Sequence, residues 1–230
     1  MATAGELATS LAHEVNQPLA AIVTNAEAAR RYLARDGANG ADLDVILRDI
    51  AQQGERASEV IRRLRQFLRK NEPEHVPIDV NALVHETMPL VRREIEDQNA
   101  AVDLDLGPDM PAIVADPVQV QQVLVNLVTN ACDAMSEQDG ERRIRVLTRA
   151  TGNGISIEVH DTGPGVAPEI RDRLFQPYAT TKASGMGLGL PICRTIVEAH
   201  GGRLALVHTS AAGAAFRVEL PGDARGDGRT

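Results

Sequence analysis

A regular apolar spacing in the first third of the chain constrains the fold more than any other feature. Between residues 43 and 68, aliphatic and small side chains recur at alternating intervals of four and three residues, which keeps them on one side of a helix. They are Leu43, Leu47, Ile50, Gly54, Ala57, Ile61, Leu64 and Leu68. A second helical pattern spans about residues 4–34, and its apolar stripe comprises Leu7, Leu11, Val15, Pro18 and Ile22. Glycine and asparagine at residues 37–40 break the pattern, so the two segments predict an antiparallel helical hairpin.

A hairpin of this kind exposes too much apolar surface to be stable alone. Two hairpins packed side by side bury that surface in a four-helix bundle. We therefore expect a homodimer.

Prolines mark the end of the helical part. The stretch Asn71–Pro77 contains Pro73 and Pro77, and a polar, proline-bounded stretch predicts a linker that can act as a hinge. We expect a helical domain at residues 1–70, the linker at residues 71–77 and a second domain at residues 78–221. Residues 222–230 carry no large apolar side chain and are expected to form a disordered tail.

Helical and strand patterns alternate beyond the linker. Helices are expected at residues 80–97, 117–136, 169–175 and 189–200, and strands at residues 101–106, 113–115, 144–148, 155–160, 203–208 and 215–220. This order predicts an α/β sandwich with helices on one face of a mixed sheet. The fold class expected for the whole chain is α followed by α/β.

The composition argues against several classes of protein. A formal net charge of -8 and a pI near 5.3 disfavour broad electrostatic binding to nucleic acid. No apolar run approaches the ~18 residues of a membrane span, and no signal peptide is evident. Two cysteines without a CxxC pair or a His/Cys cluster indicate neither a disulfide framework nor a zinc site. We expect a cytoplasmic setting.

His13 is the first candidate functional residue. It lies on the side of its helix away from the apolar stripe, beside Glu14 and one turn before Gln17. Glu14 can accept a hydrogen bond from one ring nitrogen, which fixes the tautomer and leaves the lone pair of the other nitrogen free for attack. Pro18 can bend the helix just beyond this point. Taken alone, a histidine at this position is most simply an ordinary surface histidine.

Two asparagines and an aspartate are the next candidates. Asn126 and Asn130 share one face of the helix expected at residues 117–136, and amide oxygens suit Mg²⁺ that also binds phosphate. Asp161 ends a strand before Gly163 and Gly165, and its carboxylate can accept a hydrogen bond from the exocyclic amine of adenine. A β-turn capped by Asp161 is the alternative interpretation of that loop.

A second glycine-rich stretch, Gly185–Leu190, precedes the helix expected at residues 189–200. Backbone N–H groups at the start of a helix can bind phosphates. The loop follows no strand, so it is not a Rossmann motif, and the chain has no P-loop sequence. Lys182 lies in the short stretch between the glycine loops and can reach terminal phosphates. The alternative interpretation is a solvated lysine in a plain connecting loop.

Together these motifs resemble the catalytic core of the sensor histidine kinases. His13-Glu14-x-x-Gln17-Pro18 resembles the phosphoacceptor box of that family. Asn126–Ala131, Asp161–Gly165, the stretch from Phe175 to Lys182 and Gly185–Leu190 resemble, in order and spacing, the boxes of the Bergerat-type ATP-binding fold. Histidine kinases share that fold with DNA gyrase B, Hsp90 and MutL. The sequence Leu11–Ile22 and the very short lid resemble the FixL-like class in particular.

The resemblance implies a role for each matching residue. His13 would be phosphorylated, Glu14 would orient it, and Gln17 would position the acceptor or a hydrolytic water. Asn130 would bind Mg²⁺, Asn126 would contact phosphate or metal, and Asp161 would bind adenine. The remaining nucleotide-binding residues would be Gly163, Gly165, Thr181, Lys182, Gly185, Gly187, Leu188 and Gly189. The chain departs from the family at Ala214, where the family often has threonine, and this would cost one hydroxyl contact.

One substitution favours transfer of the phosphoryl group over hydrolysis. Gyrase-type ATPases carry a water-activating glutamate four residues before the metal-binding asparagine, where this chain has Asn126. An amide cannot act as a general base, so the transferred group must meet another nucleophile, and His13 fits that role. We therefore expect an ATP-dependent protein-histidine kinase that passes phosphate to the receiver domain of a response regulator, with phosphatase activity as a second capacity. The alternatives are an Hsp90- or MutL-like conformational clamp and a non-catalytic dimeric phosphotransfer scaffold.

Only twelve residues precede His13, too few for a sensor domain. We expect the input to come from an upstream sensor domain or from a partner outside this chain.

Overall fold

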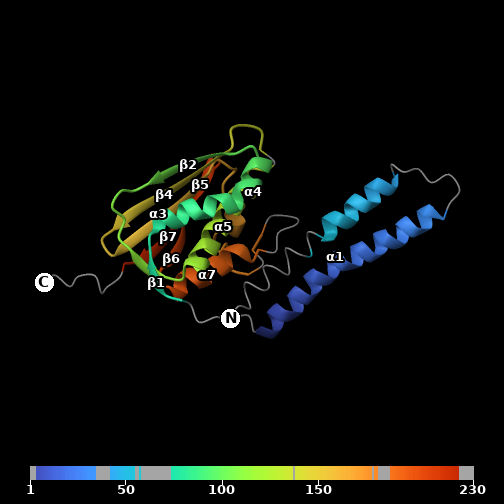
Figure 1. Ribbon diagram of the computed structural model, residues 1–230, viewed down its shortest axis with the longest axis horizontal. Helices are drawn as coiled ribbons and strands as arrows, with labels where there is room; N and C mark the ends of the chain where they lie inside the picture. Colours follow the sequence, from blue (N-terminus) through green and yellow to red (C-terminus); the bar gives the residue numbers. More distant parts are fainter. Residues whose placement is uncertain are drawn as a thin grey trace. The chain divides into compact units, whose positions relative to one another are not determined.

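The computed structural model describes residues 4–34, 42–54, 57, 74–136, 138–177, 179–180 and 187–222. The chain divides into two compact units, Met1–Asn71 and Glu72–Thr230 (Figure 1). Within the described residues, no helix is both long and apolar enough to span a membrane. Of the predicted tail at residues 222–230, Gly222 is described, with its N–H donating to the Asn153 carbonyl at 2.8 Å, and residues 223–230 lie outside the described part.

The first unit contains a helical hairpin. Helix α1 (Ala4–Leu33) runs beside a second helical segment at residues 42–54, and the Tyr32 hydroxyl donates to Asp42 Oδ2 at 2.5 Å near the turn (Figure 1). Pro18, Ala29 and Ala57 are buried in this unit. The predicted hairpin is therefore confirmed. The predicted turn at residues 37–40 and the heptad positions after Ala57 lie outside the described residues.

Large apolar side chains remain exposed on the hairpin. Leu19, Val23, Val45 and Leu47 keep 44%, 58%, 58% and 51% of their surface. Leu47 belongs to the heptad stripe, and its exposure in the single chain agrees with the expectation that a lone hairpin leaves apolar surface uncovered. A two-helix layer has two apolar sides, and the partner helix can cover only one of them.

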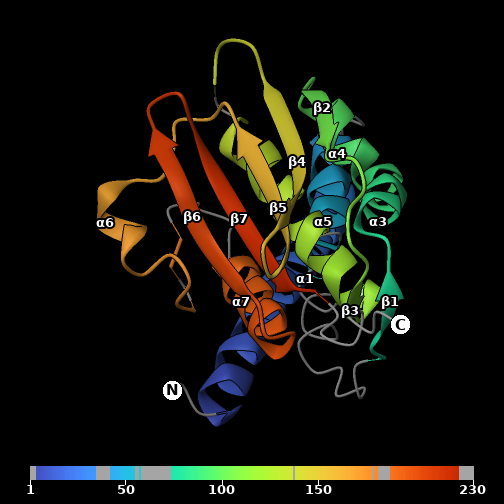
Figure 2. The ribbon, with the colours of Figure 1, turned by 90° about the vertical axis from the view of Figure 1, so that its left-hand side faces the viewer.

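The second unit is built on a five-stranded mixed sheet (Figure 2). Its strands, in spatial order, are β2 (Ala101–Leu106), β4 (Arg143–Thr151), β5 (Gly154–Asp161), β7 (Gly213–Pro221) and β6 (Arg203–Ser210). Strand β2 pairs with β4 in parallel, and the other neighbours pair antiparallel. The predicted mixed sheet is confirmed.

A separate two-stranded ladder shortens the predicted linker. Strand β1 (Val76–Ile78) pairs antiparallel with β3 (Ile113–Ala115), with Pro77 opposite Val114. The sequence had assigned Val76 and Pro77 to the linker. Because Pro77 lies in an edge strand, its missing N–H does not interrupt the ladder.

The helix predicted at residues 80–97 is interrupted. Helix α3 (Val80–Thr87) passes into the 3₁₀ turn η1 (Met88–Val91) and then into α4 (Arg92–Asp97). Pro89 explains the break, since it has no N–H to donate and its ring crowds the preceding turn. Helix α6 (Pro168–Arg171) is likewise shorter than the predicted helix at residues 169–175.

The core lies between one face of the sheet and the helices α3, α5 (Pro117–Ala134) and α7 (Gly189–Ala199). Alternate strand residues such as Ile144, Val146 and Ile157 are fully or almost fully buried against these helices. The opposite face carries ion pairs, including Arg145 with Asp105 at 2.5 Å. One covered face and one polar face match the predicted sandwich.

Arg142 joins three segments at one end of this core. Its Nη1 donates to the Gln98 carbonyl at 3.0 Å and to the Gln98 side chain at 3.2 Å. Its Nη2 donates to the carbonyls of Ser136 at 3.3 Å and Gln138 at 3.0 Å. Since these carbonyls follow α4 and α5, the guanidinium satisfies acceptors that the helices leave open.

Replacing Arg142 with alanine should destabilise the second unit by about 1–3 kcal/mol, because several partly buried carbonyls lose a charged donor. Denaturant unfolding followed by circular dichroism measures this change. The control is Arg93→Ala, whose side chain is 85% exposed and lies 3.8 Å from Asp97. Equal stability of the two variants would contradict the role assigned to Arg142.

Candidate active site

Helix α5 presents both predicted asparagines on one side. Its opposite side, from Val120 to Leu127, is buried in the core, which leaves Asn126 and Asn130 partly accessible one turn apart. Asp116 caps the start of the helix by accepting from two backbone N–H groups. The amphipathic pattern thus places both amides at the edge of the core.

Helix α7 packs against α5 in the opposite direction. At the start of α7, a Cβ built on Gly189 would lie 3.8 Å from Nδ2 and 3.9 Å from Oδ1 of Asn130. One turn further along α7, the Cys193 Sγ donates to the Val123 carbonyl at 3.9 Å. Asn130 therefore lies at the N-terminal end of α7.

The start of α7 has a backbone conformation and an uncapped first turn that suit an anionic ligand. Gly187 has φ +62°, a left-handed conformation that favours glycine. Leu188 is the N-cap residue and provides no side-chain hydrogen bond to the first turn. The first N–H groups of a helix have no partner within the helix, and they attract anions.

Asp161 is held at the end of β5. Its Oδ1 accepts from the Gly163 N–H at 2.9 Å and from the Ala214 N–H at 3.2 Å. The bond to Gly163 is the turn-capping role that the sequence left open as an alternative. The bond from Ala214 is made by the backbone, so it does not depend on the residue type at the position where the family often has threonine.

The glycines after Asp161 permit close contacts. A Cβ on Gly163 would lie 2.9 Å from Asp161 Oδ1 and 3.2 Å from the Cβ of Ala134 in α5. Gly165 has φ +76°, and a Cβ there would lie 2.1 Å from the Ser210 carbonyl oxygen. Any side chain at these positions would push the loop away from α5 and β6.

The last two turns of α5 therefore meet both glycine loops. Asn130 lies beside Gly189, and Ala134, one turn later, lies beside Gly163. Motifs that are far apart in the sequence converge on this end of one helix.

Two contacts near this site were missed by the sequence analysis. Thr162 Oγ1 donates to the Glu141 carbonyl and accepts from the Arg143 N–H, both at 3.0 Å, which ties the loop to β4. Cys193 is fully buried and forms a hydrogen bond with the Asn126 side chain. A hydroxyl directly after Asp161 was a usable signal for the first contact, but no sequence pattern indicated the second.

Several predicted site residues have side chains outside the described part of the structure. His13, Glu14 and Gln17 lie within helix α1, but their side chains are outside the described part of the structure. Thr181, Lys182 and Gly185 are also outside it.

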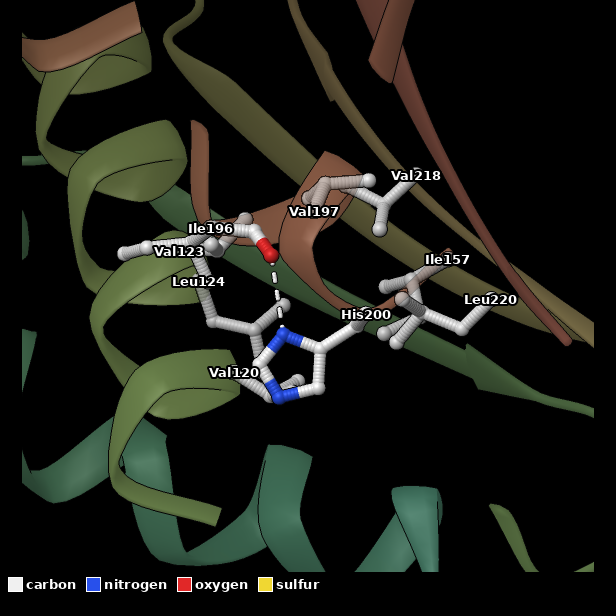
Figure 3. Close-up of a pocket in the computed structure, with 9 residues that line it drawn as sticks. All are labelled: Val120, Val123, Leu124, Ile157, Ile196, Val197, His200, Val218 and Leu220. Atoms are coloured by element: carbon white, nitrogen blue, oxygen red, sulfur yellow. Dashed lines mark hydrogen bonds between the residues drawn. The ribbon is translucent and has the colours of Figure 1, made fainter. Parts of the chain in front are cut away.

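The hollow in Figure 3 belongs to the core and not to this site. It is lined by Val120, Val123, Leu124, Ile157, Ile196, Val197, His200, Val218 and Leu220. It has no room for a water molecule, and it lies towards the opposite ends of α5 and α7 from Asn130 and Gly189. We interpret it as packing between two helices and the sheet.

Comparison with known families covers both units. Residues 3–73 match the His Kinase A (phospho-acceptor) domain, and residues 115–224 match the histidine kinase-, DNA gyrase B- and HSP90-like ATPase family. The crystallised catalytic domain of histidine kinase ThkA is 31% identical, with a TM-score of 0.58, over 64% of this chain and 95% of that domain. This chain belongs to the histidine kinases.

The relatives of this histidine kinase include a member of the FixL-like class that the sequence predicted. The sensor protein FixL of Bradyrhizobium diazoefficiens is 41% identical over 218 residues, which are 94% of this chain and 43% of FixL. ThkA in complex with the response regulator protein TrrA shares the fold, with a TM-score of 0.70 and 24% identity over 94% of this chain and 61% of that one. The chain spans less than half the length of the curated relatives that it matches.

The buried thiol gives a test of the α5–α7 contact. Burial raises the pKa of Cys193 to about 12 from its ordinary value of 9.0, despite the opposing hydrogen bond from Asn126. Above about pH 9 the unfolded chain loses this proton while the folded protein keeps it. The free energy of unfolding therefore falls by up to about 1.4 kcal/mol for each further pH unit.

We expect the free energy of unfolding to fall more steeply between pH 9 and pH 11 in the parent than in Cys193→Ala, as measured in urea. Other titrating groups, Cys132 included, are common to both proteins and cancel in the comparison. Parallel pH profiles would show that Cys193 is not buried in the folded protein.

Proposed function

We propose that this chain is the catalytic core of a dimeric, ATP-dependent protein-histidine kinase that phosphorylates its own His13. The observation that supports this most directly is the convergence of both glycine loops on Asn130 and Ala134 of α5. A carboxylate, an amide and an uncapped helix start near one helix end suit a molecule with a base and a phosphate chain. The family membership supports ATP as that molecule.

The roles of the individual residues are proposed as follows. Asp161 binds the adenine amine, and its two backbone donors keep the carboxylate oriented for this contact. Gly163 and Gly165 line the base pocket because they let the backbone approach closely. The phosphates are bound by Thr181, Lys182, Gly185, Gly187, Leu188 and Gly189.

Mg²⁺ is proposed as the companion of the nucleotide, with Asn130 as its protein ligand and Asn126 as a contact to phosphate or metal. Amide oxygens are hard, neutral donors, and Mg²⁺ usually combines one or two protein ligands with phosphate oxygens and waters. The described part of the structure has no cluster of three or more histidine, cysteine, aspartate or glutamate residues that could hold a metal. Bound together with ATP, the ion would neutralise charge on the phosphates.

Transfer is favoured over hydrolysis by the residue types. Asn126 cannot take a proton from water, so the site positions the terminal phosphoryl group without activating a water molecule. A ring nitrogen of His13 forms the new N–P bond as the bond between the γ-phosphorus and the β–γ bridging oxygen breaks, and ADP leaves. Glu14 accepts the proton from the other ring nitrogen and orients the ring.

A homodimer is proposed for the hairpin unit. Exposed Leu19, Val23, Val45 and Leu47 supply apolar surface on both helices, and a second hairpin would cover it in a four-helix bundle. Residues 71–73 are proposed as the hinge that lets the second unit reach His13.

The phosphoryl group is proposed to pass to an aspartate in the receiver domain of a response regulator. The partner named for the structurally similar ThkA supports this assignment. Gln17 would position a hydrolytic water for phosphatase activity. A sensor domain outside this chain, in a larger protein or a separate partner, would supply the signal, and the core would act in the cytoplasm.

Incubation with γ-labelled ATP tests the kinase directly. We expect acid-labile, base-stable label on the parent and none on His13→Gln. Asn130→Ala should label about 100-fold more slowly, because the charge on the phosphates is no longer held in place. His85→Gln, at an exposed histidine of α3, is the matched control. Rapid phosphate release without labelled protein would instead favour the conformational clamp.

The adenine contact is tested by Asp161→Asn. Loss of the charged acceptor should weaken ATP binding about 10–100-fold and narrow the preference for ATP over GTP, as measured by calorimetry. Asp172→Asn makes the same chemical change at an exposed position and should bind ATP normally. Unchanged selectivity in Asp161→Asn, with an unchanged melting temperature, would remove Asp161 from the base site.

A further inference from the structure

A second polar cluster joins α5 and α7 at the ends remote from the glycine loops. His200 follows α7 as its C-cap residue and is 7% exposed, and Asp116 is the N-cap residue of α5 and is 9% exposed. Neither residue belongs to the proposed nucleotide site.

The hydrogen bonds of His200 define a single neutral tautomer. Its Nδ1–H donates to the Ile196 carbonyl at 2.8 Å, and its Nε2 accepts from the Asp116 backbone N–H at 3.0 Å. Figure 3 shows the ring amid aliphatic side chains of α5, α7 and the sheet, with the bond to Ile196 dashed. The imidazole thus links the last turn of α7 to the N-cap residue of α5.

Asp116 uses both carboxylate oxygens. Oδ1 accepts from the N–H groups of Val118 at 2.9 Å and Gln119 at 3.1 Å, which caps α5. Oδ2 accepts from the Glu74 N–H at 3.3 Å. The neighbouring ring of His75 lies 5.1 Å from that of His200, measured between centroids.

These contacts fall where the chain enters the second unit. Glu74 lies just after the boundary between Asn71 and Glu72, and β1 begins two residues later. The hydrogen bond to Asp116 and the ring contact with His200 attach residues 74 and 75 to the second unit ahead of the strand.

We propose that Asp116, held in place by His200, anchors the interdomain linker and so sets the reach of the ATP-binding unit towards His13. Both are positioning residues, and neither contacts the reacting atoms. Asp116 and Asn130 are about 21 Å apart along α5 at ~1.5 Å per residue, so one rigid helix carries the linker anchor and the proposed metal ligand. This inference rests on the proposed kinase function.

The physical reason is effective concentration. Transfer between two linked units depends on how often the donor group meets the acceptor in the right orientation, and a longer or looser linker lowers that frequency. Releasing Glu74 from Asp116 lengthens the free linker by up to two residues, Glu74 and His75, because β1 begins at Val76. The rate of transfer to His13 should then fall, while the nucleotide site at the other end of α5 is unaffected.

Asp116→Asn separates the two roles of the carboxylate, which are to cap α5 and to accept the Glu74 N–H. The amide oxygen can still cap α5, but the amide nitrogen has no lone pair to accept the Glu74 N–H. In the whole chain we expect hydrogen–deuterium exchange at the Glu74 amide to become about 10-fold faster. This factor corresponds to the loss of a hydrogen bond that contributes about 1.4 kcal/mol. We expect kcat for autophosphorylation to fall about 3–10-fold, with KM for ATP changed less than 2-fold. Asp109→Asn, in an exposed loop, is the matched control and should match the parent.

A pair of His200 variants tests the support of the anchor. His200→Leu keeps an apolar ring-sized group but loses both hydrogen bonds, and it should reproduce the lower kcat and the faster exchange of Glu74. His200→Gln offers one donor and one acceptor and should restore both readouts at least in part. A purely steric role for His200 would make leucine the better replacement, which would overturn its assignment as a positioning residue.

The outcomes separate this inference from the proposed function. Unchanged exchange of Glu74 in Asp116→Asn would overturn the anchor, and faster exchange with unchanged kcat would overturn its role in transfer. A rise in KM as large as the fall in kcat would place the effect in the nucleotide site instead. ATP binding by the parent without any label on His13 would overturn the proposed kinase function, and the kinetic role of the anchor with it.

Discussion

The antiparallel packing of α5 on α7 is the constraint on which the second unit depends. The two helices share an apolar seam against the sheet, and each contact along the seam fixes the next: Asn130 beside Gly189, Cys193 beside Val123, and His200 bonded to Asp116. Close-packed helices cannot slide past one another without opening voids. The register of this pair therefore decides where both ends of each helix lie.

The polar groups on this seam sit at its ends, where they are functional candidates. Towards the C-terminal end of α5, the Asn130 amide lies beside the start of α7, and Ala134 lies beside a glycine loop that is bonded to Asp161. At the N-terminal end, an imidazole in one tautomer joins the two helices and the incoming chain. Buried polar groups of this kind need complete hydrogen bonding, which makes both ends specific in their geometry.

Most of the fold was predictable because apolar periodicity reports which side of an element is buried. The heptads predicted the hairpin, and strand and helix patterns predicted a mixed sheet covered on one face. Predictions failed where one local rule overrode the pattern. Pro89 turned an expected helix into two, and Val76 and Pro77 left the expected linker to pair with β3.

By itself, the sequence determined the two units, the family and the types of residue that would serve a nucleotide, since motif spacing and residue chemistry are local properties. Only the tertiary structure brought Asn130 to Gly189 and Ala134 to Gly163, and gave Cys193, Ala214 and His200 their partners. Those contacts join residues between about 30 and 80 positions apart, and no periodicity within one element encodes them. They follow from how two helices and a sheet pack, which is a property of the folded core.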